Sequence, residues 1–195
     1  VTEGMDQIKL LIEVDDGGTH YARARHYEDL IDTHDPAPRI QRSDDDQFML
    51  FTGGTTGLPK GVVYRIGDIT DFMVQNLPMF YGMNVVLDST EALIKFVKNL
   101  AASDSPPTSL PACPLMHTAG LMNGVLPQLL CGAKIVTLPS HSFDATEMLE
   151  AVERERVTFT VIVGDAFCLP ILKALDEAKA RGRTYDLASL GIVMS

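Results

Sequence analysis

Short apolar stretches alternate with helical patterns through the second half of the chain, and this alternation constrains the fold more than any other feature. Segments typical of strands and of helices follow one another from residue 110 to residue 194. Strands that are separated by helices pair in parallel, because each helix brings the chain back to start the next strand in the same direction. Parallel sheets are covered on both faces. The sequence therefore predicts an α/β fold: a largely parallel sheet with helices on both faces.

Individual elements can be placed from residue type and periodicity. Short apolar runs predict strands at residues 8–14, 48–51, 62–64, 110–114, 133–138, 158–163 and 191–194. The run at residues 158–163 is rich in β-branched and aromatic residues, which favour strands. Apolar residues at helical spacing predict helices at residues 27–33, 66–81, 91–101, 118–130, 145–155 and 165–180. Asp144 precedes the fifth of these helices and is expected to be its N-cap.

Composition excludes some classes of partner. Of the 195 residues, 46% are hydrophobic and 22% are charged, which is ordinary for a globular protein, and the formal net charge is −10. That charge argues against nucleic acid or an anionic membrane as the main partner. The most apolar long stretch, residues 157–172, is broken by Asp165 and Pro170 and is too short for a transmembrane segment. Cys113, Cys131 and Cys168 lie in apolar contexts, which favours reduced thiols and a cytoplasmic location.

A loop rich in glycine and threonine connects two of the predicted strands. Residues 51–61 read Phe-Thr-Gly-Gly-Thr-Thr-Gly-Leu-Pro-Lys-Gly. Consecutive backbone N–H groups in such a turn form a concave site for an anion, and glycine lets the ligand approach the backbone. Threonine hydroxyls and a lysine add donors that suit phosphate. The predicted polyphosphate-binding residues are Thr52, Gly53, Gly54, Thr55, Thr56, Gly57 and Lys60.

Two simpler interpretations of acidic and glycine-rich stretches stay open. A glycine cluster between strands is often only a hairpin turn, although common hairpins need two to five loop residues and no lysine. The loop also differs from the P-loop of nucleotide hydrolases, in which Ser or Thr follows the lysine, whereas Gly61 follows Lys60 here. Ser43-Asp44-Asp45-Asp46 is an acidic run. Three adjacent carboxylates can bind a metal, but they are more often a solvated loop or the start of a turn.

The glycine-threonine loop resembles the phosphate-binding signature of the AMP-forming acyl-CoA synthetases. These enzymes belong to the adenylate-forming superfamily, together with luciferases and peptide-synthetase adenylation domains. In the usual signature a serine stands where this chain has Gly53, so one hydroxyl donor is missing. The resemblance implies ATP, Mg²⁺ and CoA as cofactors and co-substrates. It also implies that Lys60 stabilises phosphate charge rather than transferring protons, and that a loop hydroxyl such as that of Thr56 could bind Mg²⁺.

A second motif begins where the fourth predicted strand ends. Residues 114–120 read Pro-Leu-Met-His-Thr-Ala-Gly, and ligands of open α/β sheets bind at the carboxyl ends of strands. His117 could simply cap the following helix or hydrogen-bond within its loop. The segment also resembles the second motif of acyl-CoA synthetases, which implies that His117 and Gly120 border the acyl pocket. In that interpretation His117 shapes and gates the pocket and transfers no proton.

A third stretch, residues 161–167, reads Val-Ile-Val-Gly-Asp-Ala-Phe. Gly164 permits close backbone approach, and Asp165 is a good N-cap for the following helix. By resemblance, Gly164 and Asp165 belong to a wall of the acyl channel. The wording of this stretch, with Val-Glu-Arg-Glu-Arg-Val at residues 152–157, is similar to that of actinobacterial fatty-acid and steroid-side-chain CoA ligases.

The resemblance implies that the parent protein activates a carboxylic acid, of long-chain fatty or steroid type, to an acyl-adenylate and then to acyl-CoA. Residues 1–195 are expected to be part of the N-terminal adenylation domain, because the adenine, ribose and hinge motifs and the catalytic lysine of the C-terminal domain are not found in them. The segment alone is therefore expected to be inactive. The alternatives are an adenylating enzyme that loads a carrier protein, a luciferase-like oxygenase, and a non-catalytic nucleotide-binding module.

Overall fold

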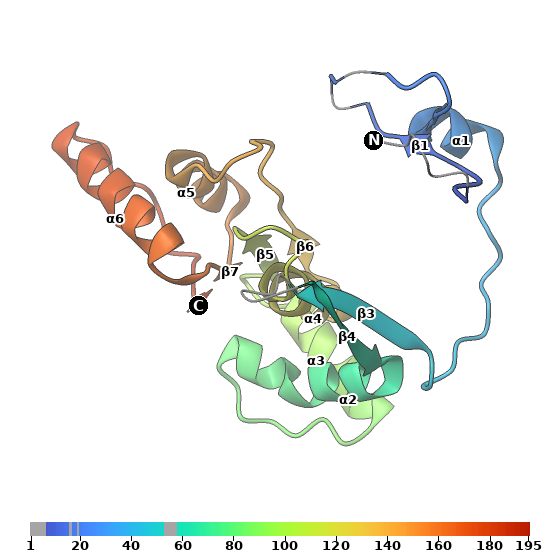
Figure 1. Ribbon diagram of the computed structural model, residues 1–195. Coiled ribbons are helices and arrows are strands. Elements are labelled where there is room, and N and C mark those ends of the chain that lie inside the picture. The colour runs from blue at the N-terminus through green and yellow to red at the C-terminus, as the bar shows by residue number, and fades with distance from the viewer. Residues whose placement is uncertain (1–6, 16, 19, 53–57) are drawn as a thin grey trace. The chain divides into compact units, whose positions relative to one another are not determined.

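The computed structural model describes residues 7–15, 17–18, 20–52 and 58–195 (Figure 1). The chain divides into two compact units, residues 1–42 and residues 43–195, and each is described by itself. No helix in the described ranges is both long enough and apolar enough to cross a membrane.

The first unit contains a pair of very short strands and one helix. β1 (Ile12–Glu13) and β2 (Arg25–His26) pair in parallel, with Glu13 opposite His26. α1 (Tyr27–Thr33) follows directly and carries Glu28 and Asp29 in its first turn, where acidic side chains favour the helix dipole. Only two residues of the predicted strand at residues 8–14 are paired, because β2 offers only two partners.

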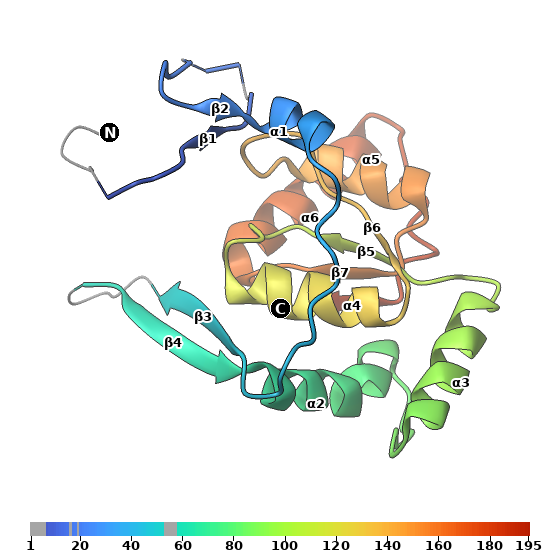
Figure 2. The same ribbon diagram turned by 90° about the vertical axis from the view of Figure 1, so that its right-hand side faces the viewer.

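The second unit is built on a four-stranded sheet in which every pair of neighbours is parallel (Figure 2). The strand order is β6-β5-β7-β8. The strands are β5 (Thr108–Pro111), β6 (Lys134–Ile135), β7 (Phe159–Val161) and β8 (Ile192–Met194). β5 and β7, the two inner strands, are entirely buried. The prediction of an α/β fold with a parallel sheet is confirmed.

Helices cover both faces of this sheet, as Figure 2 shows. On one face lie the π-helix η2 (Ala119–Val125) and α4 (Leu126–Leu130), and on the other lie α5 (Ala145–Glu155) and α6 (Gly164–Ala180). The β5 side chains alternate between these layers. The Ser109 hydroxyl donates to the carbonyl of Gly124 at 2.7 Å, whereas Leu110 packs with Met148 and Val152 of α5.

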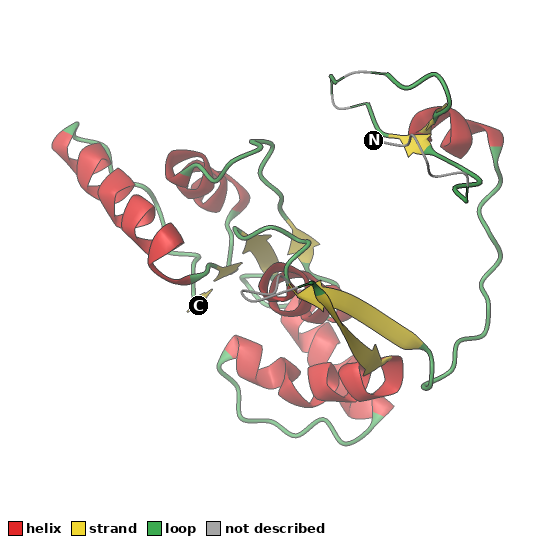
Figure 3. Cartoon of the chain, viewed as in Figure 1, coloured by secondary structure: helices red, strands yellow, loops and turns green. Residues whose placement is uncertain are grey.

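An antiparallel hairpin precedes the sheet in the chain (Figure 3). β3 (Gln47–Thr52) pairs along its whole length with β4 (Lys60–Arg65). β4 leads into α2 (Ile66–Asn76), the 3₁₀ helix η1 (Leu77–Tyr81) and then α3 (Thr90–Ala101). A second apolar cluster joins these helices and includes Leu77, Phe96 and Leu100.

Two predicted helices change their winding partway, and in both cases a proline lies near the change. The helix predicted at residues 66–81 becomes a 3₁₀ helix at Leu77, with Pro78 next in the chain. The helix predicted at residues 118–130 is a π-helix as far as Val125 and then an α-helix that contains Pro127. Proline has no N–H to donate, so the regular hydrogen-bond pattern cannot continue through it.

Candidate functional site

The β3–β4 hairpin holds both ends of the predicted phosphate loop. Thr52 and Lys60 are its last paired residues, and the Thr52 hydroxyl donates to the carbonyl of Lys60 at 3.2 Å. The connection therefore spans residues 53–59, which is longer than common hairpin loops. The predicted phosphate ligands Gly53, Gly54, Thr55, Thr56 and Gly57 lie outside the described residues, and their roles stay predictions.

Two cations at opposite ends of β4 have different surroundings. Arg65 Nη2 lies 2.6 Å from Asp45 Oδ1, and Arg65 Nη1 lies 2.9 Å from Asp68 Oδ1. The hydrogen bond to Asp45 and the charge of Asp68 raise the pKa of Arg65. Lys60, at the loop end of the strand, is exposed and takes part in no ion pair in the described part of the chain. Lys60 is therefore the cation of β4 that remains available to an anionic ligand.

The acidic run before β3 forms a turn. The N–H of Asp46 donates to the carbonyl of Ser43 at 3.0 Å, and the N–H of Gly67 donates to the carbonyl of Asp44 at 3.0 Å. Asp45 binds Arg65, as described above. These contacts hold the entrance of β3 against the start of α2, and they confirm the interpretation of residues 43–46 as a turn.

His117 lies where it was predicted, in the turn that follows β5. Its N–H donates to the carbonyl of Pro114 at 3.1 Å, and its carbonyl accepts from the N–H of Leu121 at 3.1 Å. The helix that follows has Thr118 as its N-cap and no side-chain cap. Because the backbone makes the bonds of this turn, the exposed imidazole of His117 is not used as a helix cap.

Gly120 has a structural role that the motif alone did not reveal. A Cβ atom at this position would lie 2.6 Å from the carbonyl oxygen of Pro114 and 2.9 Å from that of Cys113. Gly124, one turn later and not singled out from the sequence, would place a Cβ 2.7 Å from Pro111 Cβ. The two glycines together let η2 lie directly on the carboxyl end of β5.

The predicted cap role of Asp165 is wrong. α6 begins at Gly164, its N-cap is Val163, and no side chain caps it. Gly164 adopts a left-handed φ of 53°, and its N–H donates to the hydroxyl of Ser195 at 3.1 Å. The helix starts one residue earlier than predicted, which places the exposed Asp165 inside the first turn instead of before it. The predicted roles of Gly164 and Asp165 in an acyl channel are not tested.

A cavity of about 320 Å³ lies at the carboxyl ends of β5 and β6. Its walls are mostly apolar and include Cys113, Pro114, Phe143 and Phe167. The ring centroids of Phe143 and Phe167 lie 4.6 Å apart. Burial raises the pKa of the Cys113 thiol. His141 also lines the cavity and was missed by sequence reasoning. It follows β6 as His117 follows β5, so the same rule about the carboxyl ends of strands would have found it.

A smaller apolar cavity, of about 200 Å³, lies between the hairpin, α2 and η2. Aromatic and methionine side chains dominate its walls, among them Tyr64, Phe72, Met73 and Met122. Thr118 also lines it, which places the cavity beside His117 in the chain. Within the described ranges, none of the predicted site residues lines either cavity. Leu115 and Thr118, which are near His117 in the chain, line the larger and the smaller cavity respectively.

Comparison with known proteins supports the resemblance found in the sequence. The family model described as "AMP-binding enzyme" matches residues 2–195. The medium-chain acyl-CoA ligase Mig of Mycobacterium avium is 31% identical over 194 residues, which cover 97% of this chain and 33% of that protein. A medium/long-chain-fatty-acid and 3-oxocholest-4-en-26-oate CoA ligase of Mycolicibacterium smegmatis is 30% identical over 192 residues. These residues cover 96% of this chain and 33% of that protein.

Solved structures share the fold at lower identity. The anthranilate CoA ligase AuaEII, in complex with anthranoyl-AMP, aligns with a TM-score of 0.64 at 18% identity and covers 97% of this chain and 32% of its own. The O-succinylbenzoate coenzyme A synthetase of Bacillus subtilis, in complex with AMP, aligns with a TM-score of 0.57 at 20% identity. The alignment covers 93% of this chain and 41% of the synthetase. The chain spans about a third of the length of the curated relatives named above. Because the family model matches nearly every residue, the chain belongs to the AMP-binding enzyme family.

Proposed function

We propose that a protein carrying this segment activates a carboxylic acid with ATP. The carboxylate attacks the α-phosphate, pyrophosphate leaves, and the thiol of CoA then displaces AMP from the acyl-adenylate. The observation that carries this proposal is the family match over residues 2–195, which includes the glycine-threonine loop between β3 and β4. The named relatives are CoA ligases, which favours CoA over a carrier protein as the acceptor.

In this proposal the loop holds the β- and γ-phosphates and the departing pyrophosphate. Such chemistry depends mainly on positioning and on charge stabilisation. Lys60, at the base of the loop, is exposed and forms no ion pair with any described residue, which fits a polyphosphate ligand, and Thr52 is its partner in the strand pairing. The other proposed ligands are the backbone of Gly53, Gly54 and Gly57 and the hydroxyls of Thr55 and Thr56. Mg²⁺ would offset phosphate charge, and the Thr56 hydroxyl is its proposed ligand in this segment.

We propose an apolar acid of fatty or steroid type as the substrate. The relatives from M. avium and M. smegmatis are named for medium- and long-chain fatty acids and for 3-oxocholest-4-en-26-oate. The cavity lined by Phe72, Met73 and Met122 offers an apolar surface close to Thr118. We assign His117 and Gly120 to the border of the acyl pocket, and Gly164 and Asp165 to a wall of the acyl channel.

The proposed activity can be tested by asking whether the acyl-adenylate is transferred to CoA. A protein of the relatives' length that carries this segment should convert a fatty acid, MgATP and CoA into acyl-CoA, AMP and pyrophosphate. Formation of AMP that depends on the acid but never yields acyl-CoA would contradict the CoA-ligase proposal and favour a carrier protein. Absence of acid-dependent AMP formation with every fatty and steroid acid offered would favour a nucleotide-binding module.

We further propose that the 195 residues alone do not catalyse acid-dependent ATP–pyrophosphate exchange, since they span about a third of the length of the relatives. The same exchange assay, run on the 195-residue chain and on its Lys60→Ala variant, should give equal and negligible rates. Exchange by the unsubstituted chain well above that of the variant would contradict this proposal.

We place the protein in the cytoplasm. The three cysteines are free, and Cys113 and Cys131 are buried. Unpaired buried thiols are typical of proteins in a reducing compartment.

A further inference from the structure

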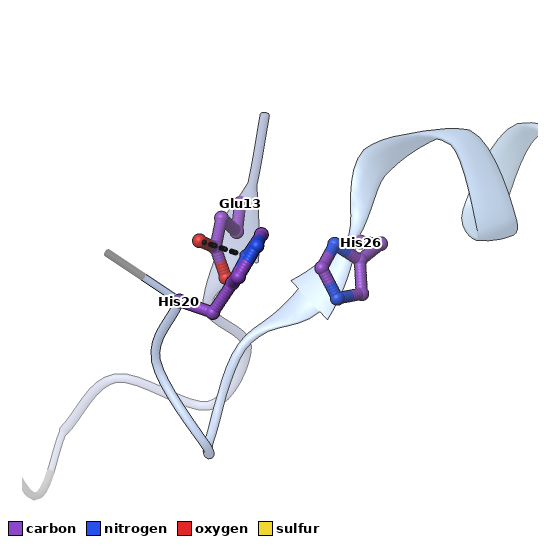
Figure 4. A group of neighbouring side chains, drawn as sticks. All are labelled: Glu13, His20 and His26. Carbon is purple, nitrogen blue, oxygen red and sulfur yellow. Dashed lines mark hydrogen bonds and ion pairs between the residues drawn. The ribbon is translucent and has the colours of Figure 1, made fainter. Parts of the chain in front are cut away.

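Three side chains in the first unit converge although they are separated in sequence (Figure 4). Glu13 ends β1, His26 ends β2, and His20 lies in the segment that connects the two strands. One ligand atom from each residue, a carboxylate oxygen or an imidazole nitrogen, lies within 4.8 Å of the other two. The rings of His20 and His26 lie edge to face, with their centroids 5.3 Å apart.

The fold itself creates this convergence. The parallel register places Glu13 directly opposite His26. The connecting segment then folds back, so that His20 Nδ1 lies 3.0 Å from Glu13 Oε1, and the N–H of Tyr21 donates to Glu13 Oε2 at 3.2 Å. The Glu13 side chain is only 12% exposed, and both of its carboxylate oxygens are engaged by residues of the connecting segment.

Two imidazoles and a carboxylate form a ligand set that suits zinc and neighbouring transition metals. Histidine nitrogen and carboxylate oxygen both bind Zn²⁺ at about 2.0–2.2 Å, in tetrahedral geometry. Ligand atoms in such a site lie about 3.4 Å apart. His20 Nδ1 and Glu13 Oε1 are already 3.0 Å apart, and all three ligand atoms lie within 4.8 Å of one another, so binding needs only a modest adjustment of their positions. His20 and His26 are exposed, and their rings can rotate to make it. Ca²⁺ and Mg²⁺ prefer oxygen ligands and fit this group poorly.

A bound ion would also meet a structural need. β1 and β2 have only two residues each, and none of the described residues in the first unit is buried. Strand pairs this short have little stability without a staple or a core. A metal bound to Glu13, His20 and His26 would join both strand ends to the middle of their connection.

We propose that Glu13, His20 and His26 bind one ion of the Zn²⁺ class, which fastens the segment between β1 and β2. The proposal is independent of the adenylation chemistry, because it assigns to the ion no role in phosphate or acyl binding.

Imidazole NMR of the unsubstituted 195-residue chain tests the site without any substitution. Adding one equivalent of Zn²⁺ should shift the ring resonances of His20 and His26, while those of His34, His117 and His141 stay in place. Backbone amides between residues 14 and 25 should exchange more slowly with the ion bound. Shifts confined to the other histidines, or no shift at all at one equivalent, would overturn the proposal.

Calorimetric titration of variants provides the matched control. His20→Ala and His26→Ala should each weaken Zn²⁺ binding by at least about tenfold, and Glu13→Gln should do the same by removing the carboxylate. His34→Ala removes an exposed histidine of the same unit that lies outside the group, and it should bind Zn²⁺ like the parent chain. Equal affinities for all four variants would refute the assignment of the ligands.

Discussion

Lys60 and Arg65 illustrate how the two cations of one strand acquire different roles. Arg65 is held between Asp45 and Asp68, and its charge stabilises the junction of the hairpin with α2. Lys60, at the other end of β4, has no such partner among the described residues. In a chain with a net charge of −10, a triphosphate is repelled at long range, so local donors of this kind must overcome that repulsion.

Gly120 provides a prediction at the scale of one residue. In Gly120→Ala the new methyl group would meet the carbonyl oxygens of Pro114 and Cys113 at 2.6 and 2.9 Å. Because both are backbone atoms, η2 must move, and we expect a loss of about 1–3 kcal/mol in the free energy of unfolding. Urea unfolding measures this loss.

Gly191→Ala is the matched control for that substitution. Its methyl group would lie 3.7 Å from the carbonyl of Thr158, which is an ordinary contact, so the cost should stay within about 0.5 kcal/mol. If the two variants lost equal stability, close packing of η2 on Cys113 and Pro114 would not explain Gly120.

The helices α5 and α6 differ at their first residues. Asp144 caps α5, since its Oδ1 accepts from the N–H groups of Thr146 and Glu147 at 2.8 and 3.1 Å. Asp165 lies inside α6 and makes no cap. Asp144→Ala should therefore cost about 1 kcal/mol of stability, and Asp165→Ala about 0.3 kcal/mol from the helix dipole. Thermal unfolding of the two variants compares these values, and an equal or reversed order would contradict the assignment.

Elements with a strong local signal could be predicted from the sequence. α5 begins and ends at the predicted residues, because it combines an Asp cap with a clear apolar face. Hairpin strands 48–51 and 62–64 were found but lengthen at both ends once they pair. The close approach of η2 could not be predicted, since it rests on tertiary contacts of Gly120 with Cys113 and Pro114 and of Gly124 with Pro111. β6 is shorter than predicted because β5 pairs with only two of its residues.

At the scale of the whole molecule, topology predicts where a site lies better than which side chains line it. The parallel sheet was expected from the alternation of elements, and with it a cleft at the carboxyl ends of the strands. The structure has a cavity there, lined by His141 and Phe167; His141 was not singled out, and Phe167 was noted only as the last residue of the stretch 161–167. Which side chains turn inward depends on loop conformations after β5 and β6, and residue type does not determine these.

The three thiols of the second unit differ in how deeply they are buried. Cys113 and Cys131 are buried, and burial raises the pKa of both thiols, so little thiolate forms at neutral pH. Cys168 is half-buried on α6. Alkylation of the folded chain at pH 7 should therefore modify Cys168 first, and the other two should react at comparable rates only after denaturation. Mass spectrometry of the peptides identifies the order, and early modification of Cys113 or Cys131 would contradict the burial described here.

We propose that the loop closed by Thr52 and Lys60 holds a polyphosphate. Its most direct test is the calorimetric affinity of the 195-residue chain for pyrophosphate and for MgATP, compared with Lys60→Ala and with Lys98→Ala, which removes an exposed lysine of α3. A charge-assisted contact contributes about 1.5–3 kcal/mol, so Lys60→Ala should bind about ten- to hundredfold more weakly, whereas Lys98→Ala should bind like the parent. Equal affinities for the parent and for Lys60→Ala would show that Lys60 does not bind the polyphosphate.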